Sequence, residues 1–170
     1  MLILLCGKMA SGKSTKAAEL VASKQAVLFS EDEWLTQLYP GLIFSVADYV
    51  KYSGLIKPIV KPLVQSLLSR SQTVVMDFPA NTPEQRAWLR SIFAEVNAPH
   101  ELIYLDSSDE VCLANLAKRR VEQPERAATD TEEMFMAMAR YFSEPSEDEG
   151  FNLVRLSTFS KYCLVSIYGF

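Results

Sequence analysis

Residues 2–15, with the sequence LILLCGKMASGKST, decide the fold of this chain. Apolar or small residues at 2–6 lead into residues 7–14, which fill every fixed position of the phosphate-binding pattern G-x-x-x-x-G-K-[ST]. The residues that follow, 15–22, favour a helix. Because the pattern lies between a predicted buried strand and a predicted helix, we interpret it as a phosphate-binding loop and not as a chance match in a Gly/Ser-rich turn.

The residue types of this loop suit the binding of a nucleotide triphosphate. Gly7 and Gly12 allow backbone angles that a Cβ atom obstructs, so successive N–H groups can turn inward around anionic oxygens. Lys13 adds positive charge at the terminal phosphates, and the Ser14 hydroxyl is a ligand for Mg²⁺. The following helix directs its positive end at the same phosphates. The predicted nucleotide-binding residues of the loop are Gly7, Lys8, Met9, Ala10, Ser11, Gly12, Lys13, Ser14 and Thr15.

The composition fits one acidic domain. The chain has 170 residues, 49% of them hydrophobic, which is enough for one well-packed domain and too few for two. A net charge of −4 gives no broad attraction to nucleic acid. Cys6, Cys112 and Cys163 are widely spaced and odd in number, as is typical of reduced thiols in the cytoplasm. The amino-terminal segment lacks a basic leader and no stretch is long enough to span a bilayer, so we expect a cytoplasmic protein without a membrane partner.

Short apolar strand patterns alternate with helical patterns along the chain. The predicted strands are residues 2–6, 26–29, 73–77, 102–105 and 151–156. Among the predicted helices between them, one opens with Thr82 as the capping residue, Pro83 in the first position and Gln85 in the third. A later one opens at Ser107, and 131–142 is a further helix with a Met-rich face. This alternation predicts an α/β fold with a parallel sheet and helices on both faces.

Three segments of the predicted single domain, 1–170, stand apart from this pattern. Residues 35–71 form a long connection without a strand pattern, which we interpret as the acceptor-side segment. Because Pro58 and Pro62 lie four residues apart, we expect one in the first turn of the helix there and the other where the helix begins or bends. Residues 119–130 are polar towards their end, and we interpret them as a lid. For 157–170, a last strand and an exposed end both remain open.

Acidic residues occur at the carboxyl ends of two predicted strands, which is where ligands bind in open α/β sheets. We interpret Asp77 as a ligand of Mg²⁺, directly or through water; the alternative is a carboxylate that caps the following turn. Asp32 is our candidate for the catalytic base, because the end of the second strand lies beside the phosphate loop in this architecture. Glu31 and Glu33 compete with it for this role or are simply solvated.

Arginines at the end of one helix and in the loop after it can supply positive charge to a transferred phosphoryl group. Arg119, Arg120 and Arg126 can move over the γ-phosphate when the site closes, or lie against adenine. The alternative is that they only oppose the dipole of the helix that they end. Arg86 can also reach a substrate, but we favour an exposed surface residue.

For the remaining candidates, a purely structural role is the alternative to a functional one. Trp34, Tyr39, Tyr49 and Tyr52 either line an acceptor pocket or belong to the core, which is where aromatic residues are more often found. His100, the lone histidine, precedes a strand, and we expect a loop residue and not a catalyst.

Four stretches together resemble a known family: GKMASGKST, SEDEW, VVMDFPANTPEQR and YLDSSDEVCLANLAKRR. Over residues 1–156, the chain resembles the small bacterial P-loop kinase-like ATP-binding proteins related to zeta toxins, chloramphenicol phosphotransferase and the kinase domain of polynucleotide kinase. This resemblance implies a nucleoside-monophosphate-kinase-like P-loop NTPase fold with a five-stranded parallel sheet, with ATP and Mg²⁺ as donor and a hydroxyl as acceptor. It also implies that Lys13 and Ser14 hold phosphate and metal and that Asp32 matches the base. Either Arg119 or Arg120 then matches the lid arginine.

These observations lead to one expected function and two alternatives. We expect a kinase that moves the γ-phosphate of ATP to a hydroxyl of a small molecule; ATP is favoured because the N-K-x-D element of guanine-specific proteins is absent. A 5′-hydroxyl nucleic-acid kinase is disfavoured by the acidic charge. The alternative from another class is a switch or binding module that hydrolyses ATP without an acceptor. Neither the acceptor nor a protein partner follows from the sequence.

Overall fold

The computed structural model describes residues 1–124 and 130–158, so Arg126, Cys163 and most of the 157–170 tail lie outside the described residues. Within that part of the chain, five strands form one parallel sheet in the order β2-β3-β1-β4-β5. The strands are β1 (Leu2–Cys6), β2 (Val27–Ser30), β3 (Val74–Asp77), β4 (His100–Ser107) and β5 (Leu153–Thr158). The predicted α/β fold with a five-stranded parallel sheet is therefore confirmed.

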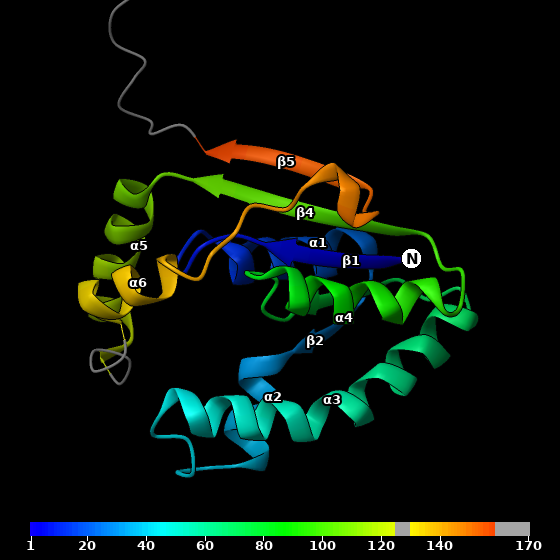
Figure 1. The fold of residues 1–170 in the computed structure, drawn as a ribbon, viewed down its shortest axis with the longest axis horizontal. Helices are drawn as coiled ribbons and strands as arrows, with labels where there is room; N and C mark the ends of the chain where they lie inside the picture. The colour runs from blue at the N-terminus through cyan, green and yellow to red at the C-terminus, as the bar shows by residue number, and fades with distance from the viewer. Residues whose placement is uncertain (125–129, 159–170) are drawn as a thin grey trace, which may run out of the picture.

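Strand β1 lies at the centre of the sheet because it is apolar on both faces. All of its residues are buried, and Leu2 lies in register with Val74 of β3 on one side and His100 of β4 on the other. Since the paired strands are all parallel, their carboxyl ends lie at one edge of the sheet, on the left in Figure 1. The phosphate loop leaves β1 at this edge.

Helices cover both faces of the sheet (Figure 1). They are α1 (Lys13–Lys24), α2 (Glu31–Leu38), α3 (Val46–Ser69), α4 (Pro83–Ala94), α5 (Asp109–Glu122) and α6 (Glu132–Ala139), with a short 3-10 helix, η2 (Glu147–Glu149). Alternate residues of β1 divide between the two faces: Leu2 and Leu4 join the core with α3 and α4, whereas Ile3 and Leu5 pack with α1. The core therefore has two halves, one on each side of the sheet.

Helix α3 contains both Pro58 and Pro62 in its interior. The expectation that one of them lies in the first turn is wrong, because the helix begins where the Ser45 side chain accepts a hydrogen bond from the N–H of Asp48. Figure 1 shows α3 changing direction along its length. Proline lacks the N–H donor and clashes with the preceding turn, which accounts for the bend. Its buried residues remain four apart, at Ile56, Val60, Val64 and Leu68.

Helix caps mark where the next elements begin. The predicted capping box of α4 is present: Thr82 accepts from the N–H of Gln85, and the Gln85 side chain accepts from the N–H of Thr82. For α5 the prediction is one residue early, since Ser108 and not Ser107 accepts from the N–H of Val111. Helix α5 thus starts just after β4, beside the phosphate loop.

Arg86 on α4 is fully buried, and the expectation of an exposed residue is wrong. Its guanidinium donates to Glu149 Oε1 at 2.8 Å and to the carbonyl oxygens of Ala80 and Ser143 at 2.9 and 2.8 Å. These contacts hold the pKa of the Glu149 carboxyl below its usual range, because a bonded cation favours the charged form. Arg86 therefore ties α4 to η2 and has no free donor for a substrate at the phosphate loop.

Candidate active site

The phosphate loop is shaped by backbone angles that its small residues permit. Gly7 and Gly12 have φ values of 153° and 98°, and Ala10 between them has 59°. A Cβ atom on Gly7 would lie 2.5 Å from Ser11 Oγ and 2.9 Å from the carbonyl oxygen of Leu105, so this position excludes any larger residue. The Ser11 hydroxyl is buried and has no hydrogen-bond partner within the described part of the chain. A cradle with an unpaired polar atom fits an anionic ligand.

Lys13, at the start of α1, is turned back onto this loop. Its ammonium donates to the carbonyl oxygens of Gly7 at 2.7 Å and Lys8 at 2.8 Å. Burial lowers the pKa of Lys13, and the neighbouring carboxylates of Asp77 and Asp32 act in the opposite direction. A triphosphate would restore a strong anionic partner to this buried cation.

Residues on α5 contact the phosphate loop on its outer side, and they are not among the site residues predicted from the sequence. Asn115 donates to the carbonyl oxygen of Ala10 at 2.9 Å. Lys8 forms a 2.5 Å ion pair with Asp109 in the first turn of α5, while Met9 and Ala10 pack against the buried cluster of Cys112, Leu116 and Phe135. The partners are about a hundred residues apart in the chain, so no local sequence pattern predicts these contacts. They form because β4, the strand before α5, pairs with β1.

The Ser14 hydroxyl donates to Asp77 Oδ2 at 2.8 Å. This contact arises because β3 is the neighbour of β1, so the last residue of β3 lies opposite the start of α1. Mg²⁺ in nucleotide sites takes one or two protein oxygens and completes its shell with phosphate and water. Within residues 1–124 and 130–158, no group of three or more His, Cys, Asp or Glu side chains could hold a metal. A hydroxyl beside one carboxylate fits a metal that phosphates help to bind.

Asp32 is exposed in the first turn of α2, directly after β2. Ser30 caps this helix by accepting from the N–H of Glu33. The Asp32 carboxylate acts weakly on the pKa of Lys13, which it raises. The structure therefore places Ser14 and Asp77 in contact beside Lys13, with Asp32 after the strand next to β3 at the same edge of the sheet.

Glu31, the neighbour of Asp32, points into the protein and is only 1% exposed. Its carboxylate accepts hydrogen bonds from the Tyr49 hydroxyl and, at 2.6 Å, from the Ser53 hydroxyl, both on α3. Burial raises the pKa of Glu31, which these two hydrogen bonds partly oppose. Glu31 therefore joins α2 to α3, and Asp32 and Glu33 remain as the exposed acids of this turn.

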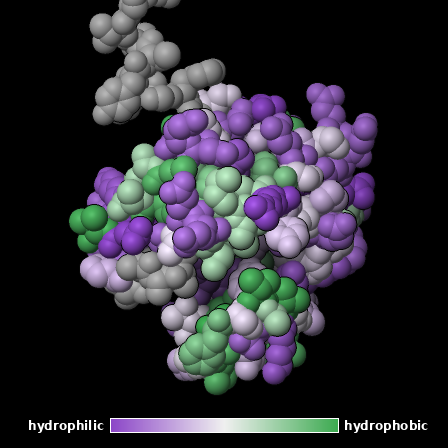
Figure 2. All heavy atoms as spheres, turned by 60° about the vertical axis from the view of Figure 1, so that its left-hand side comes forward, coloured by the Kyte–Doolittle hydropathy of each residue, from purple (hydrophilic) through white to green (hydrophobic). Residues whose placement is uncertain are grey.

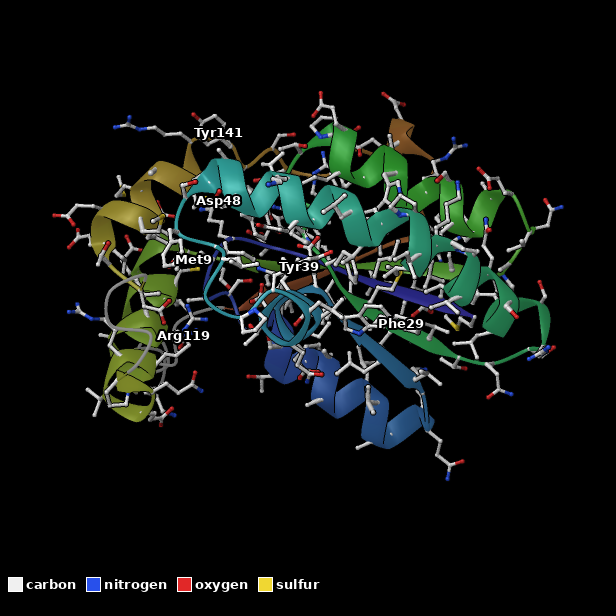
Figure 3. All side chains as sticks on the ribbon, turned by 90° about the horizontal axis from the view of Figure 1, so that it is seen from below. Met9, Phe29, Tyr39, Asp48, Arg119 and Tyr141 are labelled. Atoms are coloured by element: carbon white, nitrogen blue, oxygen red, sulfur yellow. The ribbon has the colours of Figure 1, made fainter. Side chains whose placement is uncertain are left out.

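The predicted lid arginines are only partly brought to the loop. Arg119 makes a paired contact with the buried carboxylate of Asp130, which includes a 2.7 Å bond from Nη2 to Oδ1. Arg120 is exposed on α5, and Arg126 lies outside the described residues. In Figure 3, Arg119 and Met9 lie at the same end of the molecule as Asp48, at the start of α3. Arg119 and Asp130, the two ends of the predicted lid at 119–130, are therefore held together.

The aromatic candidates and His100 make packing contacts. Trp34, Tyr39, Tyr49 and Tyr52 pack against the hydrophobic core, which agrees with the core interpretation and not with a free pocket lining. His100 is the first residue of β4 and not a loop residue; its ring stacks on Phe93 at 3.6 Å and accepts a hydrogen bond from the N–H of Asn152. Burial lowers the pKa of His100, so the neutral ring is favoured.

This loop, with a carboxylate at the end of the adjacent strand, defines the class of the protein: a P-loop nucleotide-binding protein of the kinase or ATPase type. The sequence pattern described as AAA domain matches residues 2–145, and the chain belongs to this family. The expected kinship with small P-loop kinase-like ATP-binding proteins is thereby confirmed.

Solved structures share the fold at low sequence identity. Kti12 from Chaetomium thermophilum, in complex with ADP-AlF3, is 18% identical with a TM-score of 0.66, over 92% of this chain and 89% of that one. The APS kinase CysC from Mycobacterium tuberculosis, in complex with AMPPNP and APS, is 20% identical with a TM-score of 0.60, over 92% and 87%. A sugar kinase from Janibacter sp. HTCC2649 is 16% identical with a TM-score of 0.56, over 92% and 84%.

Two further findings concern related proteins and membrane-spanning helices. Among curated proteins, none matches this sequence. In the part of the chain that the structure describes, no helix combines the length and the apolar character that crossing a membrane requires.

Proposed function

We propose that this protein transfers the γ-phosphoryl group of ATP to a hydroxyl group of a small molecule. The observation that carries the proposal is the contact between Ser14 and Asp77 beside Lys13, with Asp32 as an exposed acid at the end of the neighbouring strand. A switch that only hydrolyses ATP would use the same residues with water in place of the acceptor hydroxyl. The long acceptor-side segment, residues 35–71, favours transfer to another molecule.

In the proposed reaction, the acceptor oxygen forms a bond to the γ-phosphorus while the bond from that phosphorus to the β–γ bridging oxygen breaks. The electron pair of the broken bond leaves with ADP, and the Asp32 carboxylate takes the proton of the acceptor hydroxyl. Lys13 leaves its two carbonyl partners and donates to the β- and γ-phosphates, and the loop N–H groups hold the phosphate oxygens. Ser14 and Asp77 would hold Mg²⁺, which supplies neutralisation of phosphate charge when bound.

The arginines of the predicted lid have two proposed roles, positioning of the lid and contact with the transferred group. Arg119 positions the lid through Asp130, while Arg120 and Arg126 are the candidates for contact with the transferred group. Exchanging either of these two for alanine should then lower kcat more than it raises the KM for ATP.

Asp32→Asn tests the proposed base. The variant should lose about 10²–10⁴-fold in acceptor-dependent turnover, because an amide cannot take the proton, while calorimetry should register unchanged ATP affinity. Glu33→Gln, which alters the other exposed acid of the same turn, is the matched control and should keep its turnover. Wild-type turnover in Asp32→Asn would remove Asp32 from the mechanism, and a loss in Glu33→Gln alone would transfer the role to Glu33.

Lys13→Ala tests the phosphate site itself. It should abolish the heat of ATP binding, since the buried ammonium is the main positive charge of the loop. Folded wild-type protein that gives no heat with ATP would overturn the proposal. ATP consumption that no hydroxyl compound stimulates would instead indicate the hydrolysing switch.

A further inference from the structure

A lobe formed by α2 and the beginning of α3 stands beside the phosphate loop, and we define this acceptor lobe as residues 31–50. Figure 2 shows it at the bottom of the view, separated from the main body by a hollow, with apolar atoms gathered on its surface. Asp32, the proposed base, lies on the first turn of this lobe. A molecule that receives the phosphoryl group from the loop must therefore contact it.

The acceptor lobe carries negative charge and no positive charge. Asp32 and Glu33 are exposed on it, Asp48 is partly exposed and Glu31 is buried, and residues 31–50 contain no lysine, arginine or histidine, although Lys51 follows directly. The pKa of Asp48 is held below its usual range by hydrogen bonds from the Ser45 hydroxyl and the Phe44 N–H, so this carboxyl stays ionised. Recognition of phosphate, sulfate or carboxylate relies on arginine or lysine side chains, which this surface does not offer.

Among the described residues near the lobe and the loop, most cations already have a contact, and Arg120 is our candidate for contact with the transferred phosphoryl group. Lys51 and Lys57 of α3 lie over the rings of Tyr52 and Trp88, at 5.0 and 5.1 Å. Across the hollow, Lys8 is paired with Asp109 and Arg119 with Asp130. Lys13 belongs to the donor phosphates. An anionic acceptor would therefore have to share a cation that already has another contact.

The lobe also exposes large apolar side chains that the protein itself does not cover. Phe44 is 85% exposed, Val46 64% and Val50 62%, and Leu42 is nearly half exposed. Apolar patches of this kind on a soluble domain mark binding surfaces more often than chance exposure. They lie within a few residues of Asp48 and on the same lobe as Asp32.

We propose, on the basis of the proposed phosphotransferase function, that the acceptor is an alcohol with an aromatic or aliphatic body that is uncharged or cationic. Its apolar part packs on Phe44 and Val50, and the acids of the lobe favour a positive group such as an amine. The same charges disfavour phosphorylated and carboxylated acceptors.

A matched series of three alcohols tests the charge of the acceptor. Phenylalaninol, 3-phenylpropan-1-ol and 2-benzyl-3-hydroxypropanoate share a primary hydroxyl at the same distance from a phenyl ring and differ only at the central carbon, which carries an ammonium group, a hydrogen or a carboxylate. With ATP and Mg²⁺, release of ADP and the mass of the phosphorylated product should give kcat/KM highest for phenylalaninol and lowest for 2-benzyl-3-hydroxypropanoate, with about a tenfold difference between the extremes. Preference for 2-benzyl-3-hydroxypropanoate, or stimulation by none of the three, overturns the inference. Because ATP binding is measured separately by calorimetry, a preferred anionic acceptor leaves the proposed phosphotransferase intact.

Phe44→Ala tests the apolar contact. The KM for phenylalaninol should rise about tenfold while the KM for ATP stays constant, because the lost surface contacts only the acceptor. Leu63→Ala, which removes a 45% exposed side chain near the other end of α3, is the control and should leave both values unchanged. An unchanged KM in Phe44→Ala overturns the inference. So does a wild-type dimer that Phe44→Ala dissociates in sedimentation, since the lobe would then be an interface between two copies.

Discussion

At the scale of single residues, the site separates two adjacent acids by their surroundings. Asp32 is exposed beside the loop, whereas the Glu31 carboxylate is buried and accepts hydrogen bonds from Tyr49 and Ser53. The sequence predicts an acid at this turn but leaves open which one faces the ligand. The answer depends on hydroxyl groups of α3 that come 18 and 22 residues later in the chain.

Glu31→Ala should destabilise the protein by about 2–4 kcal/mol, because it leaves two buried hydroxyl groups without their acceptor. Urea unfolding followed by circular dichroism measures the change. Glu33→Ala removes an exposed acid from the same turn and should change the free energy of unfolding by less than about 0.5 kcal/mol. Equal effects of the two substitutions would contradict the structural role of Glu31.

Glu31 should also make stability depend on pH. Its pKa in the folded protein lies above the ordinary value of 4.5, so between the two values the folded protein binds more protons than the unfolded chain. The free energy of unfolding therefore falls as pH rises through this window. Glu31→Gln has no such titration, so its stability relative to wild type should increase as the pH rises above the ordinary value of 4.5. A difference that is constant over this range would show that Glu31 titrates at its ordinary value.

At the scale of elements, short apolar strands and capped helices are predictable because their signals are local. The positions of β1 to β5 and the capping box of α4 follow from residues within a few positions of one another. Helix α3 is different. Its two prolines suggest an interrupted helix, but in the structure the helix continues through both of them. Packing of its apolar face against the sheet keeps it helical. The burial of Arg86 is equally unpredictable from the sequence, since its partner Glu149 is 63 residues away in the chain.

Two glycines around the start of α3 offer a matched test of backbone effects. Neither would bring a new Cβ atom within 4 Å of another group, but Gly41 has a φ of +67° and Gly54 is helical. Gly54→Ala should stabilise the protein by about 0.5–1 kcal/mol through the better helix propensity of alanine. Gly41→Ala should destabilise it by about 1–2 kcal/mol through left-handed strain. Thermal unfolding measures both, and shifts of the same sign would contradict the assigned conformations.

At the scale of the whole molecule, the fold brings together groups that are far apart in the chain. Lys13 and Ser14 follow β1, Asp77 ends β3 and Asp32 follows β2, and the parallel sheet places these three strand ends side by side. The sequence predicts this meeting because the carboxyl ends of parallel strands lie at one edge of the sheet, where ligands bind. The contacts from α5 and the pairing of Arg119 with Asp130 do not follow from it, since they depend on how α5 and α6 pack beside the loop.

Nucleotide binding should therefore stabilise the whole domain in a way that depends on the metal. At about a hundredfold excess of ATP over its Kd, the free energy of unfolding should rise by about 2.7 kcal/mol, which raises Tm by about 5–10 °C. Chelation of Mg²⁺ should remove part of this shift in wild type but change little in Asp77→Asn, because the metal and its carboxylate act together. Glu95→Gln, an exposed acid at the end of α4, should behave like wild type. A shift in wild type that is the same with and without Mg²⁺ would exclude Ser14 and Asp77 as the metal site, since no other difference separates the two conditions.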